Sequence, residues 1–599
     1  MGEVASRGTL VTRRRGGIAA ALACAAALLV AVSPARAATP TVTEFSSGIP
    51  ESARIIGITA ASDGKIWFAD DGNDTAGSIN PFNQITSEIS AAGLDGIAGL
   101  TNGSDGNLYY GRTFAFNSVG GIVPATGLIR NTYLGGGASS QFWPYVPATG
   151  PEGNIWVTDP RDATTTGNDS VGLVTPRVDA GGGPSFLGAF DLTGNADPQA
   201  IAAGPTDTSS NPGEGLWVAE FSTNKIARLS PFFFAGGEGA DVKEYTGLSS
   251  GAHPTGITLG PDGNIWFSEF DAGKVGRLIP PSTVGGPPDI DEFTIPTPGS
   301  HPWGIAAGPD GNLWIAESGA GKVARMTTSG VVTGEYPTQN GSPFFITAGA
   351  DGNMWFSEGT ENTVGRITTG LDQPAFPSPA AIPIPLSGAP DTPATVNVSG
   401  LQGTITDVNV RLTGISHTFP DDLDVILESP TGQTALVMSD VGSAVSSVAT
   451  NKTSYPADGI TLTLDDQAPR RISDTNPLVS GVFKPTNITD PLEQLNEGDF
   501  PGPSNVNFPT TLSAFNGQSA NGTWKLWVDD DKLGAKDIGG KVYGGWGLDI
   551  TTTGPPQQPP PTGGNPPASS NPAVKKKCKK KKGKKASATA KKCKKKKKG

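Results

Sequence analysis

The chain has 599 residues, with 82 glycines, 52 prolines and a formal net charge of −12. This length exceeds what one core supports, so we expect about two to four domains. Three cysteines occur, Cys24 in an apolar N-terminal run and Cys578 and Cys593 in a lysine-rich tail, which excludes a disulfide-stapled body. The many turn residues, and the lack of long amphipathic helical patterns after residue 38, predict an all-β protein.

The first 37 residues are organised like a secretory signal peptide. A basic cluster at residues 13–15 precedes an apolar run at residues 18–32, and residues 35–37 form an A-x-A cleavage motif. The apolar run is shorter than the roughly 20 residues that a spanning helix needs, and no later segment is a candidate span. We therefore expect a protein that is secreted or held at the cell surface.

A phrase close to G-I-T-x-G-x-D-G-N-x-W-F-x-E recurs seven times between residues 57 and 358. Its aromatic centre recurs at intervals of 42, 47, 61, 49, 48 and 41 residues, at Trp67, Tyr109, Trp156, Trp217, Trp266, Trp314 and Trp355. Such a period, with several short strands in each unit, is typical of β-propeller blades. We expect the D-G-N step to form a tight turn and the aromatic residues after it to form a strand.

The seventh repeat lacks the T-E-F-type strand that ends other repeats. A segment of this type, TVTEF, lies at residues 41–45, ahead of the first repeat. We predict that it pairs into the seventh blade and closes the ring, because closure removes open sheet edges. The predicted propeller spans residues 38–371.

The repeated phrase, followed in several units by K-[IV]-[GA]-R, resembles the virginiamycin B lyase family of streptogramin lyases. The resemblance covers about residues 40–371 and implies a seven-bladed β-propeller. For the family it also implies cleavage of a cyclic depsipeptide antibiotic by elimination, with Mg²⁺, two histidines in P-H-[AG]-I segments and a glutamate two residues before the second histidine. Here Trp303 and Phe344 occupy the histidine positions and Ser342 replaces the glutamate. Since Trp and Phe are neither general bases nor metal ligands, a lyase would need a relocated site.

The same resemblance places two columns of non-repeating residues at the rim of the central channel. A concave aromatic surface with few polar groups suits a small-molecule or carbohydrate ligand. We therefore predict these binding residues: Trp143, Tyr145, His253, His301, Trp303 and Phe344. Alternatively, the aromatic side chains plug the channel and the histidines bond loop carbonyls. His253 and His301 are also the candidates for a displaced acid–base or metal pair.

A carboxylate follows the aromatic strand in six of the repeats, at Asp70, Asp159, Glu220, Glu269, Glu317 and Glu358. A catalytic group is rarely needed in six copies. We expect these side chains to accept hydrogen bonds within the frame of the fold.

A proline-rich linker at residues 372–384 precedes a second all-β segment at residues 385–553. Alternating apolar residues there predict half-buried strands. The motifs H-T-F-P-D-D-L-D-V at 417–425 and N-G-T-W-K-L-W-V at 521–528 resemble the P/Homo B domain of proprotein convertases, which implies a β-sandwich or jelly roll. In that family the domain flanks a subtilisin-like serine endopeptidase. This chain has no such catalytic motif, so a role as accessory protein of such a peptidase is one alternative.

Acidic clusters in the second segment are candidate Ca²⁺ ligands, because Ca²⁺ favours several oxygen ligands. They comprise Asp421, Asp422, Asp424, Asp529, Asp530 and Asp531. No EF-hand spacing accompanies them, so solvated acidic loops are the alternative. Mg²⁺ would be required only if the lyase reaction is retained.

A Pro-rich linker at residues 554–574 leads to a tail at 575–599 that holds 16 lysines and no acid. Such a segment cannot fold alone, and it suits a polyanion through counterion release. We expect a polyanionic cell-envelope polymer as its partner, with the chain's own acidic body as the alternative. Our leading hypothesis is an exported cell-surface binding protein with a ligand-binding propeller, and the alternatives are a Mg²⁺-dependent carbon–oxygen lyase and the peptidase accessory.

Overall fold

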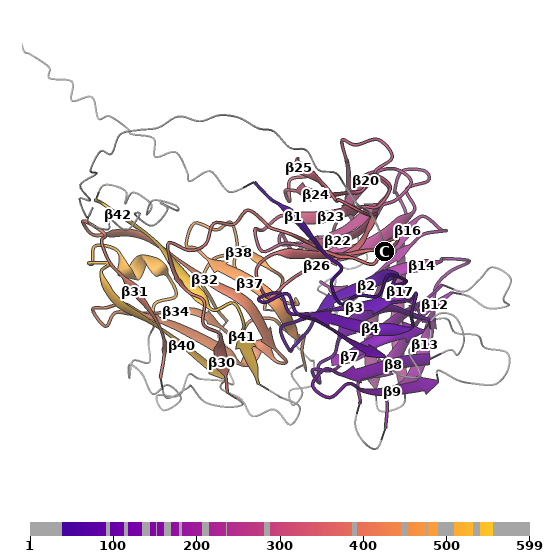
Figure 1. Cartoon of the computed structure of the whole chain (residues 1–599), viewed down its shortest axis with the longest axis horizontal. Helices are drawn as coiled ribbons and strands as arrows, with labels where there is room; N and C mark the ends of the chain where they lie inside the picture. Colours follow the sequence, from indigo (N-terminus) through magenta and orange to yellow (C-terminus); the bar gives the residue numbers. More distant parts are fainter. Residues whose placement is uncertain are drawn as a thin grey trace, which may run out of the picture. The chain divides into compact units, whose positions relative to one another are not determined.

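The computed structural model describes residues 39–554, apart from residues 91–95, 113–117, 134–143, 151–152, 161–168, 179–181, 206–214, 235–236, 281–287, 386–391, 445–452, 475, 489–507 and 531–538. The described residues form β-strands, turns and two short 3-10 helices, without an α-helix (Figure 1). The part of the chain that the structure describes therefore contains no helix long and apolar enough to cross a membrane. The predicted signal peptide, the predicted Pro-rich linker at 554–574 except Gly554, and the lysine-rich tail lie outside the described residues.

Residues 42–367 form seven antiparallel sheets of four strands, one for each sequence repeat. We number these repeat sheets 1 to 7. Sheet 1 contains β2 (Ile55–Ala60), β3 (Ile66–Asp70), β4 (Thr75–Ile79) and β5 (Thr86–Ser90); sheet 2 contains β6 (Ile97–Asn102), β7 (Leu108–Arg112), β8 (Ser118–Val123) and β9 (Leu128–Tyr133). Sheet 3 contains β10 (Pro147–Thr149), β11 (Ile155–Asp159), β12 (Ser170–Thr175) and β13 (Ser185–Asp191); sheet 4 contains β14 (Pro198–Gly204), β15 (Gly215–Glu220), β16 (Lys225–Phe234) and β17 (Gly237–Tyr245); sheet 5 contains β18 (Pro254–Leu259), β19 (Ile265–Glu269), β20 (Lys274–Ile279) and β21 (Asp289–Thr294). Sheet 6 contains β22 (Pro302–Ala307), β23 (Leu313–Glu317), β24 (Lys322–Met326) and β25 (Val332–Pro337); sheet 7 contains β26 (Pro343–Ala348), β27 (Met354–Glu358), β28 (Val364–Ile367) and β1 (Val42–Phe45).

The N-terminal strand β1 completes repeat sheet 7, as predicted. It pairs antiparallel with β28, from Val42 opposite Ile367 to Phe45 opposite Val364. The Glu44 carboxylate also accepts hydrogen bonds from the Gln339 backbone N–H and, at 2.6 Å, from Asn340 Nδ2. β1 therefore links residues that precede repeat sheet 1 to repeat sheet 7.

The first strands of the repeat sheets contact one another in cyclic order, which is the arrangement of a β-propeller. Each packs on the next in the order β2, β6, β10, β14, β18, β22 and β26, and β26 packs on β2. Glycine permits this approach, because a Cβ at Gly57 would lie 2.4 Å from the Ala98 carbonyl oxygen and one at Gly304 would lie 2.6 Å from that of Phe344. The repeated glycine is therefore a packing requirement of the inner strands.

The repeated tryptophan is anchored by the aspartate of its own D-G-N turn. In repeat sheet 6, Trp314 Nε1 donates to Asp310 Oδ1 at 3.0 Å, and the Arg325 guanidinium lies over the indole at 5.9 Å. Repeat sheet 5 repeats the first contact, from Trp266 to Asp262 at 2.9 Å. These indoles are fully buried. The recurring phrase thus builds the frame of each sheet.

The carboxylate column is also buried; the prediction that its members accept hydrogen bonds holds for Asp70 but is wrong for Glu269 and Glu317. Asp70 accepts hydrogen bonds from the backbone N–H groups of Arg54 at 2.8 Å and Gly72 at 3.0 Å, as the sequence predicts. Glu269 is fully buried beside Glu292, and no described N–H or O–H donor reaches either of its oxygens. Burial, and then the charge of Glu292, raise the pKa of Glu269 to about 8.

The same acid pair occurs in repeat sheet 6. Burial and the charge of Glu335 raise the pKa of Glu317 to about 8. In repeat sheet 5, Glu292 keeps its charge because Lys274 Nζ donates to it at 2.8 Å, which contributes to a lowered pKa. In repeat sheet 5, the neutral acid is therefore favoured at the buried Glu269 and the ionised form at its neighbour Glu292.

Residues 376–552 form a second all-β part of two packed sheets. One sheet orders its strands β29 (Phe376–Ser378), β42 (Trp546–Thr552), β32 (Ile405–His417), β37 (Ala457–Leu464) and β38 (Gly481–Phe483), with β41 (Gly540–Val542) pairing β32 and β30 (Ile382–Ile384). The other orders β31 (Ala394–Val398), β40 (Gly522–Asp530), β33 (Leu423–Glu428), β34 (Thr434–Ser439) and β39 (Thr486–Asn487). A two-stranded ribbon of β35 (Ser443–Ala444) and β36 (Thr453–Ser454) and the 3-10 helices η2 (Pro420–Asp422) and η3 (Leu512–Phe515) complete it.

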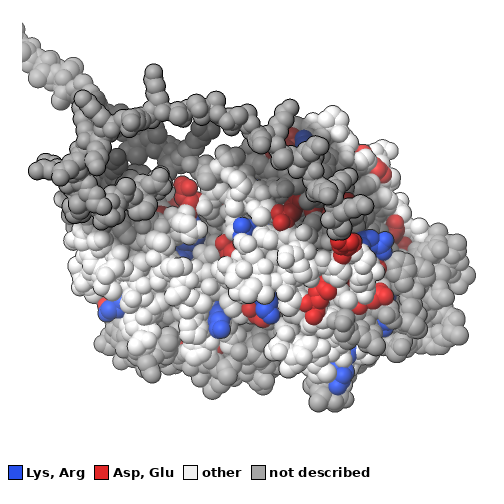
Figure 2. All heavy atoms as spheres, in the orientation of Figure 1, with Lys and Arg blue, Asp and Glu red and all other residues white. Residues whose placement is uncertain are grey.

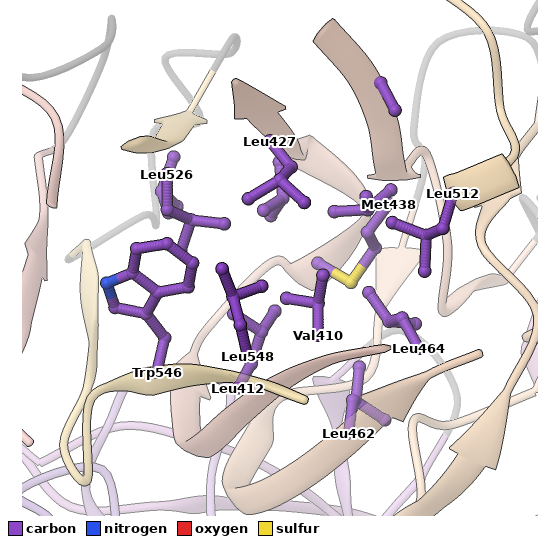
Figure 3. Close-up of a cluster of buried hydrophobic side chains, with 14 of the residues drawn as sticks. Val410, Leu412, Leu427, Met438, Leu462, Leu464, Leu512, Leu526, Trp546 and Leu548 are labelled. Atoms are coloured by element: carbon purple, nitrogen blue, oxygen red, sulfur yellow. The ribbon is translucent and has the colours of Figure 1, made fainter. Parts of the chain in front are cut away.

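One hydrophobic core joins the two sheets. Val410, Leu412 and Leu548 of one sheet pack with Leu427 and Leu526 of the other (Figure 3). The arrangement agrees with the predicted β-sandwich. The predicted linker at 372–384 needs correction, because β29 pairs with β42 and β30 pairs with β41.

Removal of β1 should destabilise the ring. A chain that lacks residues 41–45 loses its pairing with β28 and the stacking of Phe45 on Trp355, whose ring centres lie 5.4 Å apart. We expect the melting temperature to fall by roughly 5–10 °C in calorimetry. Deletion of residues 555–599, outside the compact unit that ends at Gly554, is the control and should leave it unchanged. A fall of less than about 1 °C on deletion of residues 41–45 would contradict the stabilising role of β1.

The buried glutamates predict a fold that weakens in alkali. A pKa raised from 4.5 to about 8 means that the protonated form stabilises the folded state fully below about pH 4.5 and that this stabilisation is lost as the pH rises through 8. Glu269→Gln cannot ionise and keeps a hydrogen-bond donor. It should raise the melting temperature at pH 9 by about 2–4 °C and change it little at pH 5.

The matched control for this prediction is Glu51→Gln, because Glu51 is exposed and lies outside the acid pairs. Scanning calorimetry of both variants at pH 5 and pH 9 measures the effect. An equal loss of stability at the two pH values for Glu269→Gln would sink the acid-pair explanation.

Candidate functional site

The candidate site lies where the first strands of repeat sheets 5 to 7 leave regular pairing, as the first strands of repeat sheets 1, 2 and 4 also do. The register shifts between Pro254 and Ile257, between Pro302 and Ile305, and between Pro343 and Ile346. These bulges contain the predicted positions Trp303 and Phe344. A bulge frees a residue from the ladder and redirects its side chain, and bulges are common beside binding sites.

Aromatic side chains from four adjacent repeat sheets meet at these bulges. Trp303 stacks on Phe344 with ring centres 4.4 Å apart, and Phe270 meets the edge of Trp303 at 5.4 Å. Phe270 also lies 6.4 Å from Phe221. We call Phe221, Phe270, Trp303 and Phe344 the aromatic cluster, and all four side chains are partly exposed.

Both predicted histidines pack on this cluster and share one carboxylate. His253 stacks on Phe221, and His301 packs at a tilt on Phe270, each with ring centres 4.7 Å apart. His253 Nδ1 pairs with Asp271 Oδ2, and His301 Nδ1 lies 3.8 Å from Asp271 Oδ1. The exposed fractions of the three side chains, 34%, 42% and 43% for His253, His301 and Asp271, leave them accessible to a ligand.

The alternative prediction, that the histidines hydrogen-bond loop carbonyls, holds for one of the two. His301 Nδ1 lies 3.2 Å from the Phe270 carbonyl oxygen, so it can donate to a loop carbonyl. His253 pairs with Asp271 instead. A neutral imidazole whose Nδ1–H is donated to a carboxylate leaves Nε2 as an acceptor, which is the arrangement of a general base or of a hydrogen-bonding partner for ligand hydroxyl and amine groups.

The backbone at the histidines is strained. His253 and His301 have φ of 52° and 42°, and Asp197 in repeat sheet 4 has φ of 51°, whereas Gly96 occupies the equivalent place in repeat sheet 2 with φ of 69°. A non-glycine residue in this region persists only where its surroundings hold it. Asn224 Oδ1 accepts from the His253 N–H at 2.9 Å, and Ser318 Oγ donates to the His301 carbonyl at 2.6 Å.

A polar group adjoins the aromatic cluster on the side of repeat sheet 4. Asp197 accepts hydrogen bonds from Gln199 Nε2 at 2.6 Å and from Ser222 Oγ at 3.3 Å. Burial, and then the charges of Asp197 and Asp71, raise the pKa of Tyr145 to about 12. The predicted residue Tyr145 therefore lies near carboxylates of two other repeat sheets, while Trp143 lies outside the described residues.

Sequence reasoning missed three members of this site, namely Phe221, Phe270 and Asp271. Phe221 and Phe270 each follow a carboxylate of the column, Glu220 and Glu269, directly. The residue that follows the carboxylate differs between repeats, and this difference was the sequence signal that could have pointed to Phe221 and Phe270. Their importance follows only from adjacency in space.

The predicted Ca²⁺ ligands of the second part are buried rather than solvated. Asp421 and Asp422 form part of η2, Asp424 faces Asp529 across β33 and β40, and Asp530 lies 3.3 Å from His417 Nε2. The solvated-loop alternative is wrong for these five carboxylates, and Asp531 lies outside the described residues. Among the described residues, no group of three or more His, Cys, Asp or Glu side chains could hold a metal ion, so a Ca²⁺ site stays a prediction.

Mg²⁺ does not fit the positions where the family resemblance would place its site. Trp303 and Phe344 offer no metal ligand, and Ser342 offers a neutral hydroxyl in place of a carboxylate.

A model of the virginiamycin B lyase family matches residues 190–411, which is less than half of the chain. No curated protein matches. The similar solved structures include a selenomethionine-substituted virginiamycin B lyase from Staphylococcus aureus, with 28% identity over 55% of this chain and 99% of that chain and a TM-score of 0.44. A streptogramin B lyase has 29% identity over 55% and 97% and a TM-score of 0.45. A catalytically inactive variant of virginiamycin B lyase from Staphylococcus aureus with quinupristin has 28% identity over 55% and 99% and a TM-score of 0.44.

The stacked pair of Trp303 and Phe344 should be energetically coupled. In a double-mutant cycle of Trp303→Ala and Phe344→Ala, we expect an interaction free energy of roughly 0.5–1.5 kcal/mol from urea unfolding, because stacked rings interact beyond the area that they bury. A cycle of Trp303→Ala with Phe82→Ala, an exposed side chain of repeat sheet 1, should show no coupling. Additive effects in both cycles would mean that the pair is not packed as described.

Proposed function

We propose that this chain is an exported cell-surface binding protein whose propeller holds a small ligand on the aromatic cluster. The observation that supports this most is the meeting of four non-repeating aromatic side chains from adjacent repeat sheets beside two exposed histidines. The frame of each sheet does not need these residues, since other repeats fold with different ones. A partly exposed aromatic surface with a few polar groups is suited to ligand binding.

We further propose a seven-bladed propeller followed by a P/Homo B-type sandwich. The seven four-stranded sheets and the cyclic contacts of their first strands support the first part. The two packed sheets of residues 376–552, with the motifs at 417–425 and 521–528, support the second. An accessory role beside a subtilisin-like peptidase rests on this second resemblance alone.

Binding without reaction is favoured because the residues expected of a lyase are replaced. Trp303 and Phe344 extend the aromatic surface where acid–base groups would be needed. One observation favours a carbon–oxygen lyase as the second candidate. Asp271 holds His253 by Nδ1, which leaves Nε2 to take up a proton from a substrate.

Two features outside the described residues support the proposed location. The signal-peptide pattern of residues 1–37 favours export, and the 16 lysines of residues 575–599 favour a polyanionic cell-envelope polymer as a second partner. The propeller would then bind its ligand at the cell surface.

Quinupristin is the first probe for this proposal, because it accompanies an inactive relative in a solved structure. We expect the full chain to bind it in calorimetric titration, and Trp303→Ala to weaken binding at least about tenfold, since an anchoring aromatic side chain contributes about 1.4 kcal/mol or more. Reversed-phase chromatography should show an unopened ring after overnight incubation. Elimination opens the ring without changing the mass, so retention time is the informative signal.

The matched control is Phe82→Ala, which removes an exposed aromatic side chain of repeat sheet 1. Equal affinity of Trp303→Ala and the wild-type chain would reject the aromatic cluster as the site. Ring opening that disappears in His253→Gln would instead favour the lyase candidate.

A further inference from the structure

Two carboxylates next to the aromatic cluster are bonded by no Arg or Lys side chain among the residues that the structure describes. Asp197 is bonded by the Gln199 amide and the Ser222 hydroxyl, which are uncharged. Asp271 pairs with the imidazole of His253, and His301 Nδ1 lies 3.8 Å from its Oδ1; an imidazole, unlike a guanidinium, is not a permanent cation. Burial raises the pKa of Asp197, and the two carboxylates give this face of the propeller a local negative charge where they are ionised.

Asp71, by contrast, is compensated by a fixed cation. Arg54 pairs with it through Nη2 and Oδ2, and the Asp71 side chain is only 8% exposed. The carboxylates that lack a fixed cation therefore lie on the side of repeat sheets 4 and 5. On the face of the molecule drawn in Figure 2, acidic and basic side chains are interspersed over a largely uncharged described surface.

The two carboxylates and the aromatic rings alternate along the site. The Phe221 backbone N–H donates to the Asp197 carbonyl at 3.2 Å, and the Phe221 ring stacks on His253, the partner of Asp271. Phe270 directly precedes Asp271, and its ring meets Trp303. A ligand on these rings therefore lies close to both negative groups.

We propose that this face binds an organic cation with apolar substituents, of the kind represented by a quaternary ammonium group; the proposal rests on the proposed function and specifies its ligand class. A cation over an aromatic ring is attracted by the negative face of the ring, and alkylated ammonium groups lose little hydration when they bind there. The nearby carboxylates add a longer-range attraction. An anionic ligand of the same shape is repelled, and a neutral one gains only from apolar burial.

A pair of probes separates charge from shape. Choline and 3,3-dimethyl-1-butanol have nearly the same size and carry the same hydroxyl, but only choline is charged. In calorimetric titrations of the full wild-type chain at pH 8, we expect choline to bind at least about tenfold more tightly than the alcohol. Binding of choline should weaken as salt is added, because part of the attraction is electrostatic.

Variants identify the groups responsible. Asp271→Asn and Asp197→Asn should each weaken choline binding by about three- to tenfold and leave the alcohol unaffected, because they remove charge and keep volume. Trp303→Leu should weaken both probes. Glu51→Gln, which removes an exposed carboxylate elsewhere, is the matched control.

The outcomes of this experiment and of the quinupristin titration are distinguishable. Equal binding of choline and the alcohol by the wild-type chain overturns the cation proposal, and this comparison requires no variant to fold. If quinupristin still binds through Trp303 in that case, the proposed binding function survives. If neither choline nor quinupristin binds, both proposals fall.

Discussion

The close approach of the innermost strands is the constraint on which the rest of this structure depends. Seven strands from seven sheets pack on one another in a ring, and the glycines at 57 and 304 leave no room for a side chain between neighbours. Each sheet must therefore present the same backbone at the same radius. That requirement explains why the glycine, the D-G-N turn and the tryptophan recur together in the sequence.

The frame and the candidate site draw on different residues of the same repeats. Trp314, Asp310 and Arg325 form a contact set that recurs in other sheets and holds the buried indole in place. The site uses the bulged position of the first strand and the residue after the buried carboxylate, where the repeats differ. Because the frame supplies the stability, these positions are free to carry strained histidines and partly exposed rings.

The repeat made the frame predictable, including the strand from residues 42–45 that closes repeat sheet 7. The contact partners within the site were not predictable, because Asp271 and His253 are 18 residues apart and meet only where β18 and β19 pair within repeat sheet 5. The pairing of Glu269 with Glu292 also depends on the fourth strand of the sheet, which a single repeat phrase does not contain. The segment at 376–384 read as a linker because of its prolines, which edge positions of a sheet tolerate.

The central claim is that the non-repeating aromatic cluster is the surface that meets the ligand. A crystal structure of the full chain grown with quinupristin tests it most directly. The account predicts an intact ligand ring lying against Phe270, Trp303 and Phe344, with a polar group within hydrogen-bond distance of His253 or Asp271. Ligand bound on another face of the repeat sheets, with these rings untouched, would contradict it.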